Sequence, residues 1–366
     1  MIPQLSKEYS LDPLYLSYFK AVAADASFTG DVEYSYAARL SEATDNSVYQ
    51  LLPAGIIFPK TPGDIQTALR IAARAEFRKI KFAPRGGGTG TNGGSLTGGV
   101  IIDVSRHMRG VGKVDPEKRT VHVESGVIKD SLNQDIKQYG LFFSPNLSTS
   151  NRATFGGMIS NDASGQGSLK YGKTSRHILD VDVVLMDGSL VTFGPVSGDA
   201  LRAKMEPDTM EGRIYRTVYE IATGKRDEIV STFPDLNRFL TGYDLKHVWD
   251  PDTGVLDISR IICGAEGTLG FIAGATLDLT PLPSFRALVN IKYDSFDSAL
   301  RHAPVLVKAG VLSVETVDSV VFGMAKKDIV WYQVKDLLTE VPGKTMDGIP
   351  DSPNIIGMGV DQRILV

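Results

Sequence analysis

The feature that most constrains this chain is a glycine-rich stretch, RGGGTGTNGG, at residues 85–94. Apolar segments border it at 79–83 and at 99–104, which predicts a β-strand on either side. Glycine leaves backbone N–H groups uncovered by side chains, so a loop of this composition can wrap closely around a pyrophosphate. A flexible linker has a similar composition but rarely joins two apolar strands. The stretch therefore predicts a phosphate-binding loop.

Length, charge and cysteine content limit the classes of protein to consider. The 366 residues suggest about two domains, and the net charge of −4 shows no basic excess that would attract nucleic acid. The single cysteine, Cys263, excludes a disulfide framework and, within this chain, an all-cysteine metal site or an iron–sulfur cluster. Neither a signal peptide nor an apolar run of the ~18 residues that a membrane span needs is present. We expect a cytoplasmic protein without a transmembrane segment, either free or peripheral to the inner face of the membrane.

Hydrophobic periodicity predicts an alternation of helices and strands with several hairpins, rather than a uniform βαβ repeat. Helices are expected at 11–25, after 61, around 132–136 and at 211–222. Strands are expected at 56–59, 79–83, 100–104, 120–124, 140–143, 180–186, 190–193 and 270–280. Asp187-Gly188 is a hairpin turn signal between two of these strands. After Pro283 a strand at 287–293 and a helix at 295–309 resemble the opening of a ferredoxin-like domain.

Two nucleotide-binding patterns match the chain but fail in their context. Residues 88–93 satisfy G-x-G-x-x-G, yet a strand rather than a helix is expected to follow, which disfavours a Rossmann site. Residues 167–174 fit the P-loop pattern G-x-x-x-x-G-K-[ST]. A P-loop needs a strand directly before it and a helix directly after it, whereas polar residues precede this one and a strand follows. We therefore expect neither a Rossmann unit nor an ATPase or GTPase.

Six segments in order resemble the FAD-binding domain of the p-cresol methylhydroxylase (PCMH) and vanillyl-alcohol oxidase family. They are residues 57–62, 85–90, 99–103, 145–150, 154–172 and 264–272. The resemblance implies an α+β fold of the PCMH type, in which two subdomains bind FAD, followed by the start of a ferredoxin-like cap domain. It implies an N-terminal helical extension at 1–47, the FAD-binding domain at 48–283 and a partial, truncated cap of the FAD-linked oxidase type at 284–366.

FAD lies extended in this family, so several loops are expected to approach it by backbone, and a side chain at the glycine pairs 87–88, 93–94 and 156–157 would push it away. Relatives that tether the flavin often carry a His directly after the glycine triplet, where this chain has Thr89, so FAD is expected to be non-covalent. The cofactor-binding residues that the resemblance implies are Arg85, Gly86, Gly87, Gly88, Thr89, Gly90, Thr91, Asn92, Pro145, Ser148, Thr149, Gly156, Gly157, Asn161, Ala163, Ser164, Gly165, Tyr171, Gly172, Glu266, Gly267, Phe271 and Ile272.

Within this family the chain is most similar to the FAD-linked 2-hydroxy-acid dehydrogenases for D-2-hydroxyglutarate, D-lactate or glycolate. Residues 171–175, 237–244 and 313–318 resemble the large bacterial YdiJ-type enzymes, which carry an iron–sulfur module after their flavin and cap domains. The resemblance implies oxidation of a small D-2-hydroxy acid to the 2-keto acid. Hydride would leave carbon 2 for flavin N5 while a base takes the hydroxyl proton. No electron acceptor is implied.

The resemblance ends near residue 348, so the chain is expected to lack part of the active site, with any iron–sulfur cluster in a missing C-terminal part of the parent protein. The family's later histidine motif is absent. Catalytic residues are therefore unknown from sequence, and the weak candidates are Arg238, Tyr243 and Lys246, since a substrate carboxylate needs a fixed cation. Glu315 and Asp318 stand at the i, i+3 spacing of a helix, within hydrogen-bonding reach of the cap or of its pocket.

Metal binding is not expected, and two other functions stay open. The five histidines, His107, His122, His177, His247 and His302, have no metal-ligand spacing. One alternative is a non-catalytic FAD-binding or electron-transfer module of a larger complex. Another is a flavin-dependent NAD(P)H reductase of the cell-wall precursor type, which shares the FAD domain but is disfavoured by the cap-like segment after Pro283.

Overall fold

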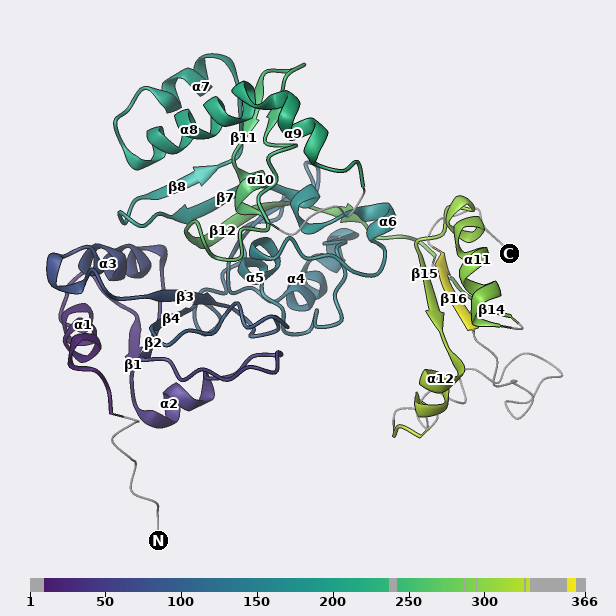
Figure 1. The fold of residues 1–366 in the computed structure, drawn as a ribbon, viewed down its shortest axis with the longest axis horizontal. Coiled ribbons are helices and arrows are strands. Elements are labelled where there is room, and N and C mark those ends of the chain that lie inside the picture. The colour runs from purple at the N-terminus through teal and green to yellow at the C-terminus, as the bar shows by residue number, and fades with distance from the viewer. Residues whose placement is uncertain are drawn as a thin grey trace, which may run out of the picture. The chain divides into compact units, whose positions relative to one another are not determined.

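The computed structural model describes residues 10–236, 242–285, 287–293, 295–325, 327–329 and 354–359. The chain divides into two compact units. The first unit comprises Met1–Gly165 and Tyr171–Pro281, and the second comprises Gln166–Lys170 and Leu282–Val366. Figure 1 follows the chain through both units by colour. Within the described ranges, no helix is long and apolar enough to cross a membrane.

The first sheet of the first unit has the strand order β1-β2-β4-β3. β4 is parallel to both β2 and β3, whereas β1 is antiparallel to β2. Helices α1 and α3 pack together beside this sheet (Figure 1), and their apolar faces share one core with its strands. The elements are α1 (Pro13–Ala23), β1 (Asp31–Glu33), α2 (Tyr36–Ser41), β2 (Gly55–Phe58), α3 (Pro62–Ala72), β3 (Phe82–Arg85) and β4 (Val100–Asp103).

One strand of this sheet starts later than the sequence predicts. The strand expected at 79–83 begins only at Phe82. The residues before it complete a turn after the 3-10 helix η2 (Ala75–Phe77), where the N–H of Ile80 donates to the carbonyl oxygen of Phe77 at 2.9 Å. This local bond uses a backbone group that a strand would need for its ladder. The side chain of Ile80 is buried although the residue lies in this turn, and burial accounts for an apolar residue outside the strand.

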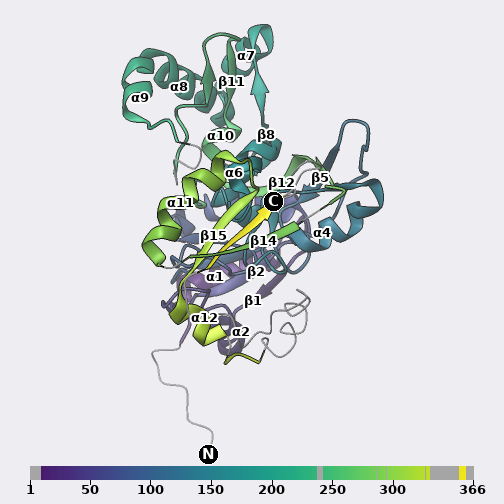
Figure 2. The ribbon, with the colours of Figure 1, turned by 90° about the vertical axis from the view of Figure 1, so that its right-hand side faces the viewer.

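The second sheet of the first unit is antiparallel, with the order β5-β12-β7-β8. Its strands are β5 (Thr120–Glu124), β7 (Ile178–Val184), β8 (Leu190–Phe193) and β12 (Phe271–Asp278). Both views show helices α7, α8 and α9 gathered at the end of the unit that also holds β11 (Figures 1 and 2). The remaining elements of the first unit are α4 (Lys129–Ile136), η3 (Lys137–Tyr139), β6 (Leu141–Phe142), α5 (Phe155–Ser160), η4 (Thr174–His177), β9 (Pro195–Val196), α7 (Gly198–Met205), α8 (Met210–Gly224), α9 (Arg226–Thr232), β10 (Trp249–Asp250), β11 (Val255–Asp257), α10 (Ser259–Ile262) and β13 (Thr280–Pro281). All but the last residue of α6 (Ser168–Tyr171) belong to the second unit.

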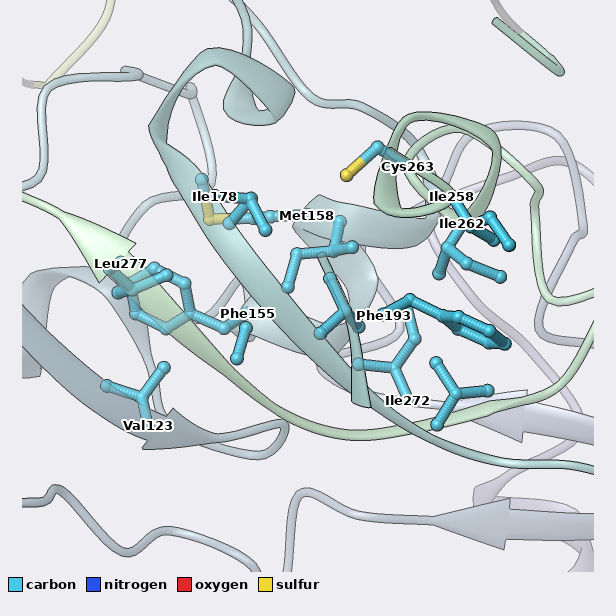
Figure 3. Close-up of a cluster of buried hydrophobic side chains, with 14 of the residues drawn as sticks. Val123, Phe155, Met158, Ile178, Phe193, Ile258, Ile262, Cys263, Ile272 and Leu277 are labelled. Atoms are coloured by element: carbon cyan, nitrogen blue, oxygen red, sulfur yellow. The ribbon is translucent and has the colours of Figure 1, made fainter. Parts of the chain in front are cut away.

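The largest core lies between the second sheet and helices α5 and α10 (Figure 3). Phe155 and Met158 of α5 and Ile262 of α10 are buried there together with strand residues. Neighbouring residues of β12 belong to different cores, since Phe271 packs in the first-sheet core and Ile272 in this one. Side chains alternate between the two faces of a strand, so β12 links the two halves of the unit.

The structure confirms both objections to the nucleotide-binding patterns. Residues 86–99 connect β3 directly to its parallel neighbour β4 without an intervening helix, so the G-x-G-x-x-G pattern opens no Rossmann helix. After the P-loop-like pattern, η4 leads straight into β7. Asp187 and Gly188 lie in the turn that returns the chain into β8, as the hairpin signal predicts. Asp187, which follows the apolar residues of β7, is therefore a turn residue.

The carboxylate of Asp64 fixes the start of α3. Its Oδ1 accepts the N–H groups of Thr29 and Gly30 at 2.5 and 3.2 Å, and its Oδ2 accepts those of Lys60 and Thr61 at 2.8 and 3.0 Å. The side chain is completely buried. Burial by itself would raise the pKa of this carboxyl, but the hydrogen bonds from Thr29, Lys60 and Thr61 outweigh it and lower the pKa below its ordinary value.

Asp64→Asn is expected to destabilise the first unit by about 2 kcal/mol at neutral pH, because an amide accepts on one side only and would turn its own NH₂ toward two N–H donors. The folded pKa of Asp64 is lowered, so its stabilising effect is complete above the unfolded pKa and is lost as the pH falls through the folded one. Urea denaturation across pH should show the difference between wild type and variant narrowing below about pH 4. A difference that stays constant with pH would contradict this account.

The second unit contains the beginning of a ferredoxin-like fold. Its strand order is β14-β16-β15, and β16 is antiparallel to both neighbours. Helix α11 packs on β15 and β16 (Figure 2). A third strand inserted between the first two is the arrangement that opens a β-α-β-β-α-β domain, so this expectation is confirmed. The elements are β14 (Ala287–Lys292), α11 (Phe296–Lys308), β15 (Ser313–Val317), α12 (Ser319–Ala325) and β16 (Asn354–Gly359).

The helical spacing assumed for two acids of this unit is wrong. Glu315 lies in strand β15 with an exposed side chain, and Asp318 follows the strand. Oδ1 of Asp318 accepts the N–H of Val321 at 2.7 Å, in the first turn of α12. A spacing of three residues therefore spans the end of a strand and the cap of the next helix, and Asp318 has a structural role.

Candidate cofactor-binding site

The glycine loop leaves the carboxyl end of β3, at the edge of a parallel sheet where ligands commonly bind. Its first residues lie directly on the loop at 152–154. A Cβ added to Gly86 would overlap the hydroxyl of Thr154, and one added to Gly87 would overlap the carbonyl oxygen of Arg152. The structure thus changes the reason expected for glycine at 87, because a side chain there would meet the chain itself before it met a cofactor.

Other glycines of the site leave room for a Cβ without overlap. Nothing lies within 4 Å of a Cβ built on Gly90, and the nearest atom is 3.9 Å away at Gly94 and 3.6 Å away at Gly157. All three residues are exposed. Gly88 and Gly93 adopt φ values of +59° and +75°, which glycine reaches without strain. Uncovered backbone along an open surface is what an extended phosphate-containing cofactor needs, so these residues fit FAD.

The guanidinium of Arg85 is used within the protein. Its Nε pairs with Glu42 at 2.5 Å, and its Nη2 donates to the carbonyl oxygen of Thr44 at 2.8 Å. Nη1 donates to the hydroxyl of Ser95 at 3.3 Å. Burial raises the pKa of Glu42, and the nearby Arg85 opposes that shift only in part. Arg85 therefore holds the N-terminal segment against the glycine loop, where the sequence suggested a direct cofactor contact.

Asn161 and Glu266 meet at the surface next to Gly94. Nδ2 of Asn161 donates to Oε1 of Glu266 at 2.7 Å, and the other carboxylate oxygen lies 3.9 Å from the Cβ position of Gly94. The backbone of Glu266 has φ +52° and its N–H donates to the carbonyl oxygen of Ser160 at 2.8 Å. The Glu266 carboxylate thus accepts a hydrogen bond from a side-chain amide. The pair brings the end of α5 and the segment 264–268 to the glycine loop.

A buried ion pair begins at Asp162, the residue after Asn161. Asp162 and Lys173 are joined directly, with side chains only 7% and 11% exposed. Oδ1 of Asp162 also accepts the N–H of Ser175 at 2.8 Å, and Asp162 itself has φ +46°. Sequence reasoning missed both residues, although they lie inside or beside motif segments that it matched. The pair ties the end of α5 to the segment that follows Tyr171.

The other predicted cofactor residues lie on neighbouring loops. Gly165 packs against the carbonyl oxygen of Asn146, which brings the 163–165 segment to the loop that contains Ser148 and Thr149. Pro145 is buried and Ser148 is exposed. The ring of Tyr171 lies edge-on to that of Phe142, with 5.8 Å between centroids. The side chains of Phe271 and Ile272 are buried in the two cores, so only their backbone is left for a cofactor.

The two weak catalytic candidates that the structure describes, Tyr243 and Lys246, make separate contacts. Arg238 lies outside the described residues. The hydroxyl of Tyr243 hydrogen-bonds to that of Thr268 at 2.7 Å, two residues after Glu266, with the ring 46% exposed. Nζ of Lys246 pairs with Asp235 at 3.3 Å instead. Of the two described residues, Tyr243 is the one that the structure places beside the proposed cofactor loops.

The histidines make local contacts. Among the described residues, no group of three or more His, Cys, Asp or Glu side chains is arranged to hold a metal ion. The histidine partners are Asp31 for His107, Asp182 for His122, the Tyr171 carbonyl for His177, Asp244 for His247 and the Tyr293 hydroxyl for His302.

Comparisons with known proteins find the same fold and a matching domain that includes the glycine loop. Residues 53–194 match the sequence profile of the FAD binding domain. The chain is 52% identical to a D-2-hydroxyglutarate dehydrogenase of Pantoea ananatis, over 95% of this chain and 34% of that protein. It is 50% identical to the D-2-hydroxyglutarate dehydrogenase of Escherichia coli, over 100% of this chain and 36% of that one. The chain thus spans about a third of the length of these curated relatives.

Solved structures show the same fold at lower sequence identity. An alkyldihydroxyacetonephosphate synthase structure superimposes with a TM-score of 0.62 at 15% identity, over 96% of this chain and 57% of that one. A second structure of that enzyme gives a TM-score of 0.63 at 16% identity, over 96% of this chain and 56% of that one. Residues 53–194 therefore match an FAD binding domain in sequence, and the chain shares the fold of these solved structures.

Proposed function

We propose that this chain is the flavin-binding part of an FAD-dependent dehydrogenase that oxidises a D-2-hydroxy acid, D-2-hydroxyglutarate or D-lactate, to the 2-keto acid. The observation that carries the proposal is the exposed backbone at Gly90, Gly94 and Gly157, where a Cβ would overlap no other atom. The sequence supports it, since the chain is 52% and 50% identical to two D-2-hydroxyglutarate dehydrogenases over about a third of their length. The activity belongs to the whole enzyme, and the chain supplies the cofactor site.

The chain's own residues divide into those that hold FAD and those that hold the loops. Backbone N–H groups of residues 86–94 would bind the pyrophosphate, while the segments around Gly157 and Glu266 lie along its path. When bound, FAD would supply the hydride-accepting chemistry of the reaction. The domain fits non-covalent FAD, since Thr89 offers no tether and Cys263 is only 2% exposed. Burial raises the pKa of the Cys263 thiol, which keeps it an unreactive thiol at neutral pH.

Anaerobic reduction tests this function. The whole enzyme that contains this chain is purified, loaded with FAD and mixed with D-2-hydroxyglutarate or D-lactate, and with the L-enantiomers as controls. Loss of the visible flavin absorbance with a D-acid alone is the expected result. Bound flavin that no D-2-hydroxy acid bleaches would favour the alternative, an FAD-binding electron-transfer module of a larger complex. A protein that stays colourless after incubation with FAD would refute both.

A further inference from the structure

Both ends of the glycine loop at 86–94 are bonded to the segment that follows α2. Arg85 directly precedes the loop, and its Nε pairs with the carboxylate of Glu42 at 2.5 Å. Ser95 directly follows the loop, and its hydroxyl donates to Oδ2 of Asp45 at 3.3 Å. Two acids that lie three residues apart in the chain therefore hold the two ends of one loop.

The segment that carries these acids is itself held in shape. Thr44 and Gln50 form an antiparallel bridge across it. Oδ1 of Asp45 accepts the N–H of Ser47 at 2.8 Å, and Nη2 of Arg85 donates to the carbonyl oxygen of Thr44 at 2.8 Å. A segment with its own bridge and turn bond gives the ends of the glycine loop a firm support.

The composition of the loop makes such support important. Six of the nine residues at 86–94 are glycine, the residue that loses most conformational freedom when it is ordered. A ligand that must order this backbone binds more weakly than one that meets a loop already in its binding shape. Nη1 of Arg85 also donates to the hydroxyl of Ser95 at 3.3 Å, which joins the two ends of the loop directly.

We propose that Asp45 is a positioning residue of the cofactor site, which keeps the glycine loop in the shape that binds FAD by holding Ser95. The inference rests on the proposed function. The carboxylate of Asp45 and a pyrophosphate carry charge of the same sign, so the acid does not bind the phosphates itself. Its contribution to affinity comes through its two hydrogen bonds, one to the segment and one to the end of the loop.

Two substitutions separate the hydrogen bonds of Asp45 from its charge. The whole enzyme that contains this chain is freed of FAD, and FAD is titrated back into the wild type and each variant. Asp45→Ala is expected to weaken FAD binding by about tenfold, because both bonds are lost. Asp45→Asn should bind FAD as the wild type does, since its amide oxygen can accept the N–H of Ser47 and its NH₂ can donate to the hydroxyl of Ser95.

Asp115→Ala is the matched control. Oδ1 of Asp115 accepts the N–H groups of Glu117 and Lys118 at 3.1 and 2.9 Å, in the turn before β5. The substitution removes a turn bond of the same kind as Asp45→Ala does, so the two variants should lose a similar, small amount of thermal stability. Only Asp45→Ala should lose affinity for FAD.

Hydrogen exchange of the FAD-free enzyme tests the loop without the cofactor. The backbone amides at 86–95 should exchange faster in Asp45→Ala than in the wild type, and at the wild-type rate in Asp45→Asn and Asp115→Ala. Unchanged exchange in Asp45→Ala would overturn this inference alone. Tighter FAD binding by both Asp45 variants would also overturn it, because the charge and not the bonds would then be what matters. Wild-type enzyme that binds no FAD would overturn the proposed function.

Discussion

Gly87→Ala is expected to abolish FAD binding and to destabilise the first unit by about 3 kcal/mol. The added methyl group would overlap the carbonyl oxygen of Arg152, a backbone atom that can move only with its loop. That loop continues through Thr154 into α5, which carries Gly156 and Gly157. Displacing it would therefore separate two segments that are proposed to hold the same cofactor. Thermal unfolding followed by circular dichroism measures the stability, and FAD titration measures the affinity.

Gly90→Ala is the matched control in the same loop. Its Cβ would have no neighbour within 4 Å, and Gly90 is not among the positive-φ glycines. The protein without FAD should keep its stability within about 0.5 kcal/mol. FAD affinity should fall if the cofactor lies against Gly90. A Gly87→Ala protein as stable as the wild type would contradict the close packing on Arg152, and a Gly90→Ala protein that is equally destabilised would show that the contact is not the cause.

Features with a local physical cause could be predicted from the sequence. The loop between β3 and β4 follows from the run of glycines between two apolar segments, and the strand expected after it disfavoured a Rossmann helix. Asp187-Gly188 predicted a hairpin because its backbone preferences act within four residues. The same local argument gave the strand-helix pair after Pro283, which is the start of the ferredoxin-like unit.

Features that depend on contacts distant in sequence could not be predicted. The resemblance placed Arg85 among the cofactor-binding residues, but it did not indicate that the Arg85 guanidinium pairs with Glu42. No sequence spacing indicates that pair, which arises only when the N-terminal segment folds onto the glycine loop. The helical interpretation of Glu315 and Asp318 failed for a related reason. A spacing of three residues does not exclude a strand that ends between them.

Lys173→Met is expected to destabilise the first unit by about 3–5 kcal/mol, because it leaves the buried carboxylate of Asp162 without its cation. Both side chains are nearly inaccessible to solvent, so water cannot replace the lost partner. FAD affinity should fall as well, since Asp162 directly follows Asn161, which hydrogen-bonds to Glu266. Lys225→Met is the matched control, because Lys225 pairs with Glu228 at 3.6 Å on the surface, with 64% and 71% exposure. Lys225→Met should lower the free energy of unfolding by less than about 1 kcal/mol.

The double variant Asp162→Asn with Lys173→Met separates loss of the pair from loss of one charge. Asn tolerates the φ of +46° at this position and its amide oxygen can still accept the N–H of Ser175. With no buried charge left, most of the lost stability should return, which a double-mutant cycle of urea denaturation measures as a coupling energy between the two sites. FAD affinity should recover with it if the pair acts only by holding the loops together. A double variant less stable than Lys173→Met alone would show that Asp162 does not need Lys173 to remain buried.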